Sequence, residues 1–126
     1  MLMKRRLIVI VDNGADTRAG LYAALDQTGY LVATCCSAFE ALRYVAEQKP
    51  DLMLCGARLW DMDGMELLEK VRATSPNTRV IVIGRKGDWP LHMEALDSGG
   101  DDLVCAPIDR EKILQAIRRS LESPAR

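Results

Sequence analysis

The sequence lacks the features that mark membrane-spanning and nucleic-acid-binding proteins. No apolar run approaches the roughly 20 residues that a membrane-spanning helix needs. The run from Leu7 to Val11, after Lys4-Arg5-Arg6, is too short for a signal peptide and ends at Asp12. The net charge is only −1, from 17 basic and 18 acidic residues, so no overall charge attracts the chain to nucleic acid. We therefore expect a cytoplasmic protein without a membrane segment or direct nucleic-acid binding.

Cysteine and histidine give no sign of a metal or a cofactor. The four cysteines, Cys35, Cys36, Cys55 and Cys105, show no metal-ligand spacing, and adjacent cysteines pair poorly in a disulfide. We expect buried, reduced thiols. The single histidine, His92, lies on an apolar helical stripe and is expected to pack there. No metal and no cofactor is predicted.

What the chain does contain is an alternation of short apolar runs with amphipathic segments. This pattern predicts a parallel sheet that is covered by helices on both faces, with strands buried on both sides. Ligands of such sheets bind at the carboxyl ends of the strands. The expected strands are 6–11, 31–35, 52–55, 79–83 and 103–105; the expected helices are 15–29, one from 38, one after Asp63-Gly64, one of about ten residues ending at 98–100, and 110–122.

Six short motifs follow one another along the chain: VDN, PDLMLC, MDG, VIVIG, ALDSGGDD and AP. In this order and spacing, they make the chain resemble the receiver domains of bacterial response regulators. The resemblance extends without gaps from about residue 4 to residue 122, so we expect 1–126 to form one receiver-like domain. It implies the flavodoxin-like (CheY-like) fold, a doubly wound five-stranded parallel sheet of strand order 2-1-3-4-5.

The residues that carry the chemistry of that family are replaced here. The resemblance implies two acidic cation ligands after the first strand, a phosphoacceptor Asp after the third, a Ser or Thr after the fourth, and a Lys after the fifth. It also implies a switch aromatic on the fifth strand, at the position of Leu103. The four other positions hold, in order, Asp12 with Asn13, Gly56, Gly84 and Ala106.

These replacements predict a receiver without a phosphorylation cycle. Gly56 has no nucleophile, Asp12 with Asn13 supplies one formal charge to a cation, and neither Gly84 nor Ala106 offers a side-chain donor. We expect a non-enzymatic pseudo-receiver that binds a protein partner. Two nearby carboxylates, Asp61 and Asp63, are expected to be solvated or to cap a helix rather than to accept phosphate. Arg58 and Arg85 either fill the pocket beside Asp12 or point to solvent.

The resemblance also implies an output face, built from the fourth helix, the fifth strand and the fifth helix. Its expected partners are a kinase, an output domain, another regulator or a second copy, although a plain solvated surface remains an alternative. A small-molecule or redox-binding domain and an atypical working phosphoreceiver stay open as other functions. So does the question of whether the chain is part of a longer protein. The residues of the face are Leu91, Glu94, Asp97, Asp101, Arg110, Lys112 and Arg119.

Overall fold

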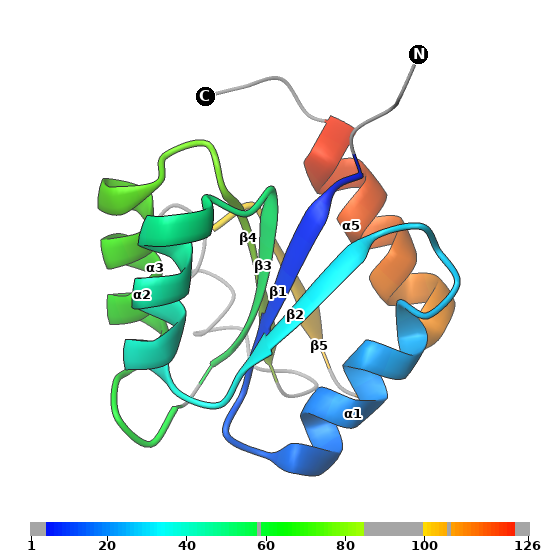
Figure 1. The fold of residues 1–126 in the computed structure, drawn as a ribbon. Helices are drawn as coiled ribbons and strands as arrows, with labels where there is room; N and C mark the ends of the chain where they lie inside the picture. The colour runs from blue at the N-terminus through cyan, green and yellow to red at the C-terminus, as the bar shows by residue number, and fades with distance from the viewer. Residues whose placement is uncertain (1–4, 58, 85–99, 106, 123–126) are drawn as a thin grey trace.

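The computed structural model describes residues 5–57, 59–84, 100–105 and 107–122. Within them, five parallel strands form one sheet in the order β2-β1-β3-β4-β5, which is the predicted order and fold (Figure 1). The chain runs outward from β1 to β2 and then returns past β1 to β3, so the winding direction reverses between β1 and β3. The strands are β1 Leu7–Val11, β2 Leu31–Cys35, β3 Leu52–Gly56, β4 Arg79–Gly84 and β5 Asp102–Cys105.

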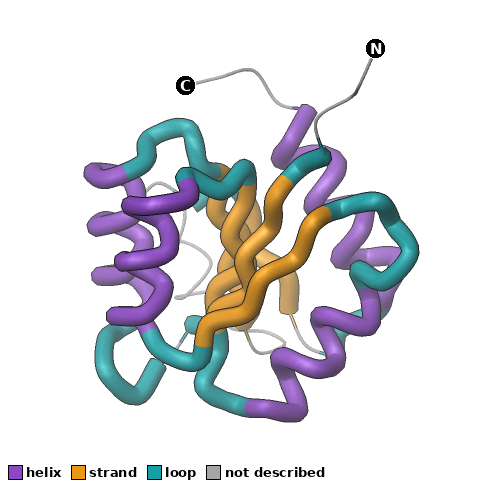
Figure 2. The backbone as a smooth tube through the Cα atoms, in the orientation of Figure 1, coloured by secondary structure: helices purple, strands orange, loops and turns teal. Residues whose placement is uncertain are grey.

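Helices cover the two faces of the sheet in pairs (Figures 1 and 2). Helices α1, Ala15–Ala24, and α5, Arg110–Glu122, lie on one face, while α2, Ala38–Gln48, and α3, Gly64–Thr74, lie on the other. Because successive side chains of a strand point to opposite faces, β1 contributes Ile8 and Ile10 to the core under α1 and α5. Val9 and Val11 enter the core under α2 and α3.

Local capping fixes where two of the helices begin. The Ser37 hydroxyl accepts a hydrogen bond from the Glu40 backbone N–H (3.2 Å), which satisfies one free donor in the first turn of α2. Asp63 Oδ1 accepts from the Met65 N–H (2.8 Å) and caps α3, as the sequence predicts. The next residue has to be small, because a Cβ at Gly64 would lie 2.6 Å from the Ala57 carbonyl oxygen. This close approach holds the start of α3 against the end of β3.

Two expectations about secondary structure are wrong. Helix α1 ends at Ala24 instead of reaching Gly29, and Gln27 (φ 62°) and Gly29 (φ 91°) adopt left-handed backbone conformations that a helix does not contain. Leu25 lies just after the last residue of α1 and is still buried, so the helical spacing of apolar residues continues past the end of the helix. Strand β2 is not buried on both sides, because it forms an edge of the sheet and exposes Leu31 and Thr34.

Some expectations fall outside the described ranges. These include the helix predicted to end at 98–100 and the placement of His92. Within the described ranges, no helix is both long and apolar enough to cross a bilayer.

Candidate functional site

The carboxyl ends of β1 and β3 bring Asp12 and Gly56 together. The two strands pair in parallel with Val11 opposite Cys55, so the residues that follow them are neighbours. The Asp12 carboxylate points toward Gly56, where a Cβ would lie only 2.5 Å from Asp12 Oδ2. The other carboxylate oxygen, Oδ1, accepts a hydrogen bond from the Gly14 N–H (2.8 Å). Asp12 therefore occupies the space in which a side chain at position 56 would begin.

Asn13 joins the loops that follow three different strands. Its side-chain Nδ2 donates to the carbonyl oxygen of Cys36 after β2 (2.8 Å). Its Oδ1 accepts from the backbone N–H of Trp60 in the loop after β3 (2.6 Å). An aspartate could accept from Trp60 but could not donate to Cys36. Asn13 is thus committed to the protein backbone through both ends of its amide.

The two carboxylates considered as alternative phosphate acceptors both bind helix N-termini. Asp61 accepts from the N–H groups of Ala38 and Phe39 at the start of α2, each at 3.0 Å. Partial desolvation favours its neutral form, but these backbone hydrogen bonds outweigh it, and the pKa of Asp61 lies below its ordinary value. Asp63 caps α3, as described above. Each side chain therefore accepts backbone hydrogen bonds through an unphosphorylated carboxylate.

The thiol next to Gly56 is chemically inert. Cys55 is completely buried in the core under α2 and α3, on the face of β3 opposite to that of a side chain at 56. Burial, with smaller contributions from Asp12 and Asp63, raises the pKa of the Cys55 thiol to about 12. Burial likewise raises the pKa of Cys35 to about 12. The expectation of buried thiols fails for Cys36, which is exposed, and holds only in part for Cys105, which is half-buried.

The residues of this site do not fit a divalent cation of the Mg²⁺ type. Such a cation takes several oxygen ligands, commonly carboxylates. Here one carboxylate oxygen of Asp12 accepts a hydrogen bond from the Gly14 N–H, and both polar atoms of the Asn13 amide are bonded to the backbone. Gly56 has no side chain that could supply a further ligand. Across the described parts of the chain, no three His, Cys, Asp or Glu side chains group as a metal site.

The remaining expected site positions are only partly described. Gly84 ends β4 and is buried, with Cys105 of β5 as its pairing partner. Leu103 is half-buried and packs against the core under α2 and α3. Ala106 and the two candidate pocket-filling arginines, Arg58 and Arg85, lie outside the described residues.

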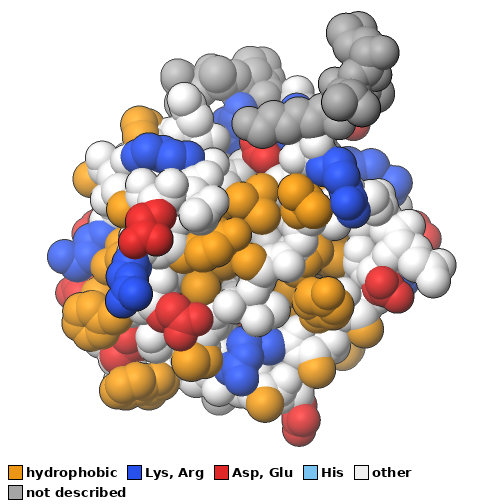
Figure 3. Space-filling model, viewed as in Figure 1, with side chains coloured by type: hydrophobic (Ala, Val, Ile, Leu, Met, Phe, Trp, Pro, Cys, Tyr) orange, Lys and Arg blue, Asp and Glu red, His pale blue; other side chains and the backbone are white. Residues whose placement is uncertain are grey.

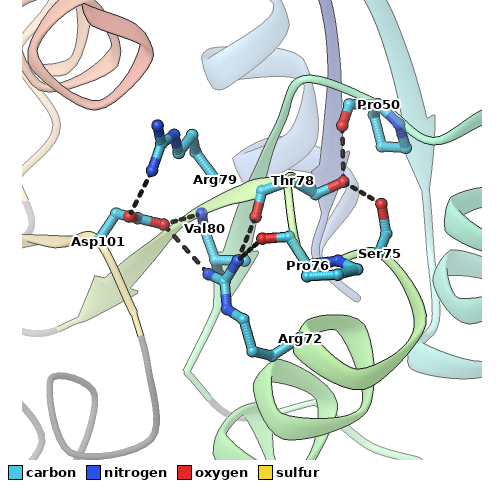
Figure 4. Close-up of polar contacts among 8 residues, drawn as sticks. All are labelled: Pro50, Arg72, Ser75, Pro76, Thr78, Arg79, Val80 and Asp101. Carbon is cyan, nitrogen blue, oxygen red and sulfur yellow. Dashed lines mark hydrogen bonds and ion pairs between the residues drawn. The ribbon is translucent and has the colours of Figure 1, made fainter. Parts of the chain in front are cut away.

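Asp101 does not belong to an exposed partner face. Its side chain is only 9% exposed and accepts hydrogen bonds from the Val80 N–H (2.8 Å) and from Arg72 Nη2 (3.2 Å). Arg79 pairs with the same carboxylate at 3.7 Å (Figure 4). This network ties α3 to β4 and β5 at the amino ends of the strands, far along the sheet from Asp12. The expectation of an accessible carboxylate at Asp101 is therefore wrong.

Three other residues of the expected face are accessible on α5. Arg110 and Lys112 are exposed, and Arg119 is exposed while its guanidinium pairs with Asp102 at 2.7 Å. The expected face residues Leu91, Glu94 and Asp97 belong to the part of the chain that is not described.

Comparison with known proteins identifies the family. The model of the response regulator receiver domain matches residues 8–118, so the chain belongs to that family, whose members act in two-component signal transduction. Sporulation initiation phosphotransferase F of Bacillus subtilis is 28% identical over 119 residues, covering 94% of this chain and 96% of that protein. The transcriptional regulatory protein ZraR of Klebsiella oxytoca is 32% identical over 114 residues, covering 90% of this chain and 26% of that protein.

Solved structures give the same result. The signal receiver domain of an HD domain-containing protein from Pseudomonas fluorescens is 28% identical, with a TM-score of 0.89 and coverage of 97% of this chain and 90% of that one.

The chain spans about a quarter of the length of the C4-dicarboxylate transport regulator DctD of Rhizobium meliloti, a relative 27% identical over 115 residues. Receiver domains interact with kinases and output domains.

Proposed function

We propose that this receiver domain does not undergo a phosphorylation cycle and acts as a protein-binding module in one conformation. The observation that supports this most strongly is the Asp12 carboxylate, which lies where a side chain at Gly56 would begin. A phosphoacceptor needs a nucleophilic oxygen at this point and a cation beside it. Gly56 supplies no such oxygen, and the described residues around it offer no set of free cation ligands.

The polar contacts of the site support a fixed arrangement. Asn13 holds the loops after β1, β2 and β3 together, and Asp61 holds the loop after β3 to the start of α2. Gly84 has no hydroxyl that could follow a phosphoryl group. In a switching receiver a ligand shifts two populations because it binds one better. Here neither Gly56 nor Gly84 has a side chain with which to hold such a ligand.

The proposed partner is a kinase, an output domain or another regulator of a two-component system. The exposed start of α5 carries Arg110, Glu111 and Lys112, which favours a partner that has charges of both signs and forms exposed ion pairs with this helix. Such exposed pairs contribute mainly to the association rate and to specificity.

Intact-mass spectrometry after incubation with acetyl phosphate and Mg²⁺ tests the proposal. We expect an unchanged mass, whereas a phosphorylatable receiver treated in parallel gains one phosphoryl group. A stable phosphoryl adduct that maps to Asp12, Asp61 or Asp63 would show that the domain has a working acceptor and would overturn the proposal.

A further inference from the structure

We propose that two copies of this chain pair through the outer edge of β2 and join their sheets across a two-fold axis. The inference does not depend on the proposal about phosphorylation. Among the described strands, β2 pairs only with β1. The Leu31 N–H donates to Arg6 O (2.9 Å) and Cys35 O accepts from the Asp12 N–H (3.2 Å). Because alternate residues of a strand face the same neighbour, Val32 and Thr34 direct their N–H and C=O groups outward.

This edge lacks three common forms of protection against pairing. Natural edge strands are commonly guarded by charged side chains, proline or a bulge. No charged residue occurs between Asp26 and Glu40, and β2 itself reads LVATC without proline. Its first residue, Leu31, is 44% exposed. Hydrophobic side chains gather along the middle of the view in Figure 3, where Figure 1 places β2.

The outward groups of β2 are complementary to themselves under a two-fold axis through Ala33. Antiparallel pairing then places Val32 opposite Thr34 of the second copy, in hydrogen-bonded pairs that form four backbone bonds in total. Ala33 meets its own copy in the non-hydrogen-bonded position, where Cα atoms approach to about 4.5 Å. The small Ala33 side chain allows that approach, and Val32 and Thr34 are β-branched residues of the kind that suit cross-strand pairs.

A groove beside the strand matches the exposed leucine. Leu31 projects to the same face of the sheet as Ala33 and Cys35, because alternate side chains share a face. In the two-fold pairing Leu31 lies opposite Cys35 of the second copy. An open groove of about 690 Å³ runs there between β2 and α2 and receives this leucine. It is lined by Thr34, Cys35, Phe39, Glu40, Arg43, Tyr44 and Glu47.

A second copy fits this edge better than an unrelated extended segment. The same surface supplies the outward backbone groups, the projecting Leu31 and the groove that receives it, so one two-fold axis satisfies all three at once. The flank of α2 that borders the groove carries both Glu40 and Arg43, so two such flanks do not meet as surfaces of a single charge. The short strand predicts a weak, concentration-dependent dimer of the 14.0-kDa chain.

Sedimentation velocity over a concentration series tests the pairing. We expect the native chain to pass from monomer to dimer as concentration rises. Thr34→Pro removes an outward N–H without removing a bond to β1, so it should abolish dimer formation. Thr34→Val keeps the N–H and nearly the same shape and should retain the dimer. A native chain that remains monomeric throughout, or a Thr34→Pro dimer as strong as the native one, overturns the proposal.

A second control separates edge pairing from general hydrophobic association. Trp60 is 76% exposed and lies in the loop after β3, so it belongs neither to β2 nor to the lining of the groove. Trp60→Ser should leave the dimer unchanged; loss of the dimer would assign the association to that loop instead.

The register is tested by cross-linking with oxidised glutathione in a Cys36→Ser background. Ala33→Cys should form a disulfide between copies, because it meets itself across the axis, whereas Thr34→Cys should not. The opposite result would contradict the two-fold arrangement even if a dimer exists.

Discussion

At the scale of single residues, Asp12 controls what position 56 can hold. Its carboxylate lies 2.5 Å from the place of a Cβ at Gly56, and its other oxygen is held by Gly14. Even a methyl group there requires Asp12 to move. A carboxylate adds repulsion between like charges in one pocket.

This contact makes Gly56→Asp a destabilising change. We expect a free energy of unfolding about 1–3 kcal/mol below that of the native chain, with part of the loss recovered when Mg²⁺ is added. Gly56→Ala is the matched control, because it introduces the same Cβ without charge. The gap between the two variants should be largest at neutral pH and narrow as the pH falls and one carboxylate takes up a proton. Urea unfolding across pH measures both effects. Equal stability of Gly56→Asp and the native chain would show that Asp12 does not restrict this position.

Asn13 provides a second test at this scale. Asn13→Asp keeps an acceptor for the Trp60 N–H but loses the donor to Cys36 O. We expect a loss of about 1 kcal/mol in the free energy of unfolding. Asn77→Asp makes the same chemical change in the exposed turn between α3 and β4 and should alter stability by less than about 0.5 kcal/mol. Similar effects of both variants would mean that the three-loop connection contributes nothing specific.

At the scale of elements, the start of α2 depends on a residue from another loop. Asp61→Ala removes the acceptor of the Ala38 and Phe39 N–H groups. We expect the free energy of unfolding to fall by roughly 1 kcal/mol. Because the pKa of Asp61 is lowered in the folded state, its stabilisation is full above the ordinary carboxyl pKa and is lost as the pH falls through the folded-state value. Unfolding of both chains as a function of pH should therefore show a gap that narrows in acid.

The control for Asp61 is an acidic residue at a helix start with no such role. Asp16 is exposed in the first turn of α1, and Asp16→Ala should cost only a few tenths of a kcal/mol. If the difference in free energy of unfolding between the native chain and Asp61→Ala stays the same in acid, the negative charge of Asp61 does not stabilise the start of α2.

The network around Asp101 yields the largest expected effect on stability. Asp101→Ala leaves Arg72, which is 19% exposed, and Arg79, which is 12% exposed, without this carboxylate, so we expect a loss of about 3 kcal/mol. Asp102→Ala is the matched neighbour, because Asp102 pairs with the largely exposed Arg119 and should cost no more than about 1 kcal/mol. Chemical denaturation of the two variants compares them directly. If Asp101→Ala lowers the free energy of unfolding by less than Asp102→Ala does, the network does not hold α3 to the sheet.

Across the whole molecule, the fold was far more predictable than the site contacts. Runs such as LIVIV and LMLCG read directly as buried strands, and each strand boundary agrees with its prediction within one residue. The parallel order brought Asp12 next to Gly56, as expected from the ends of adjacent strands. The predicted helix 15–29 was longer than α1. Leu25 is buried in the turn after the helix, and the spacing of apolar residues cannot distinguish this position from a buried position within the helix.

The contacts that the sequence did not reveal join side chains to distant backbone groups. Asn13 binds backbone groups 23 and 47 residues away, and no spacing of residue types encodes such partners. The same holds for Asp61, which caps a helix that begins more than 20 residues before it. Asp101 looked like a surface carboxylate because the arginines that surround it come from α3 and from the start of β4. The packing of the sheet, rather than local sequence, brings these groups together.

We propose that this receiver holds one conformation, and NMR with beryllium fluoride and Mg²⁺ tests that most directly. Beryllium fluoride mimics a phosphoryl group on an aspartate, and a domain with Gly56 in that position has no oxygen to bind it. We predict that the amide spectrum of the native chain is the same with and without the reagent, while a phosphorylatable receiver in the same buffer shifts. Resonance changes that extend from the ends of β1 and β3 to β5 and α5 would show a ligand-driven switch and would contradict the account.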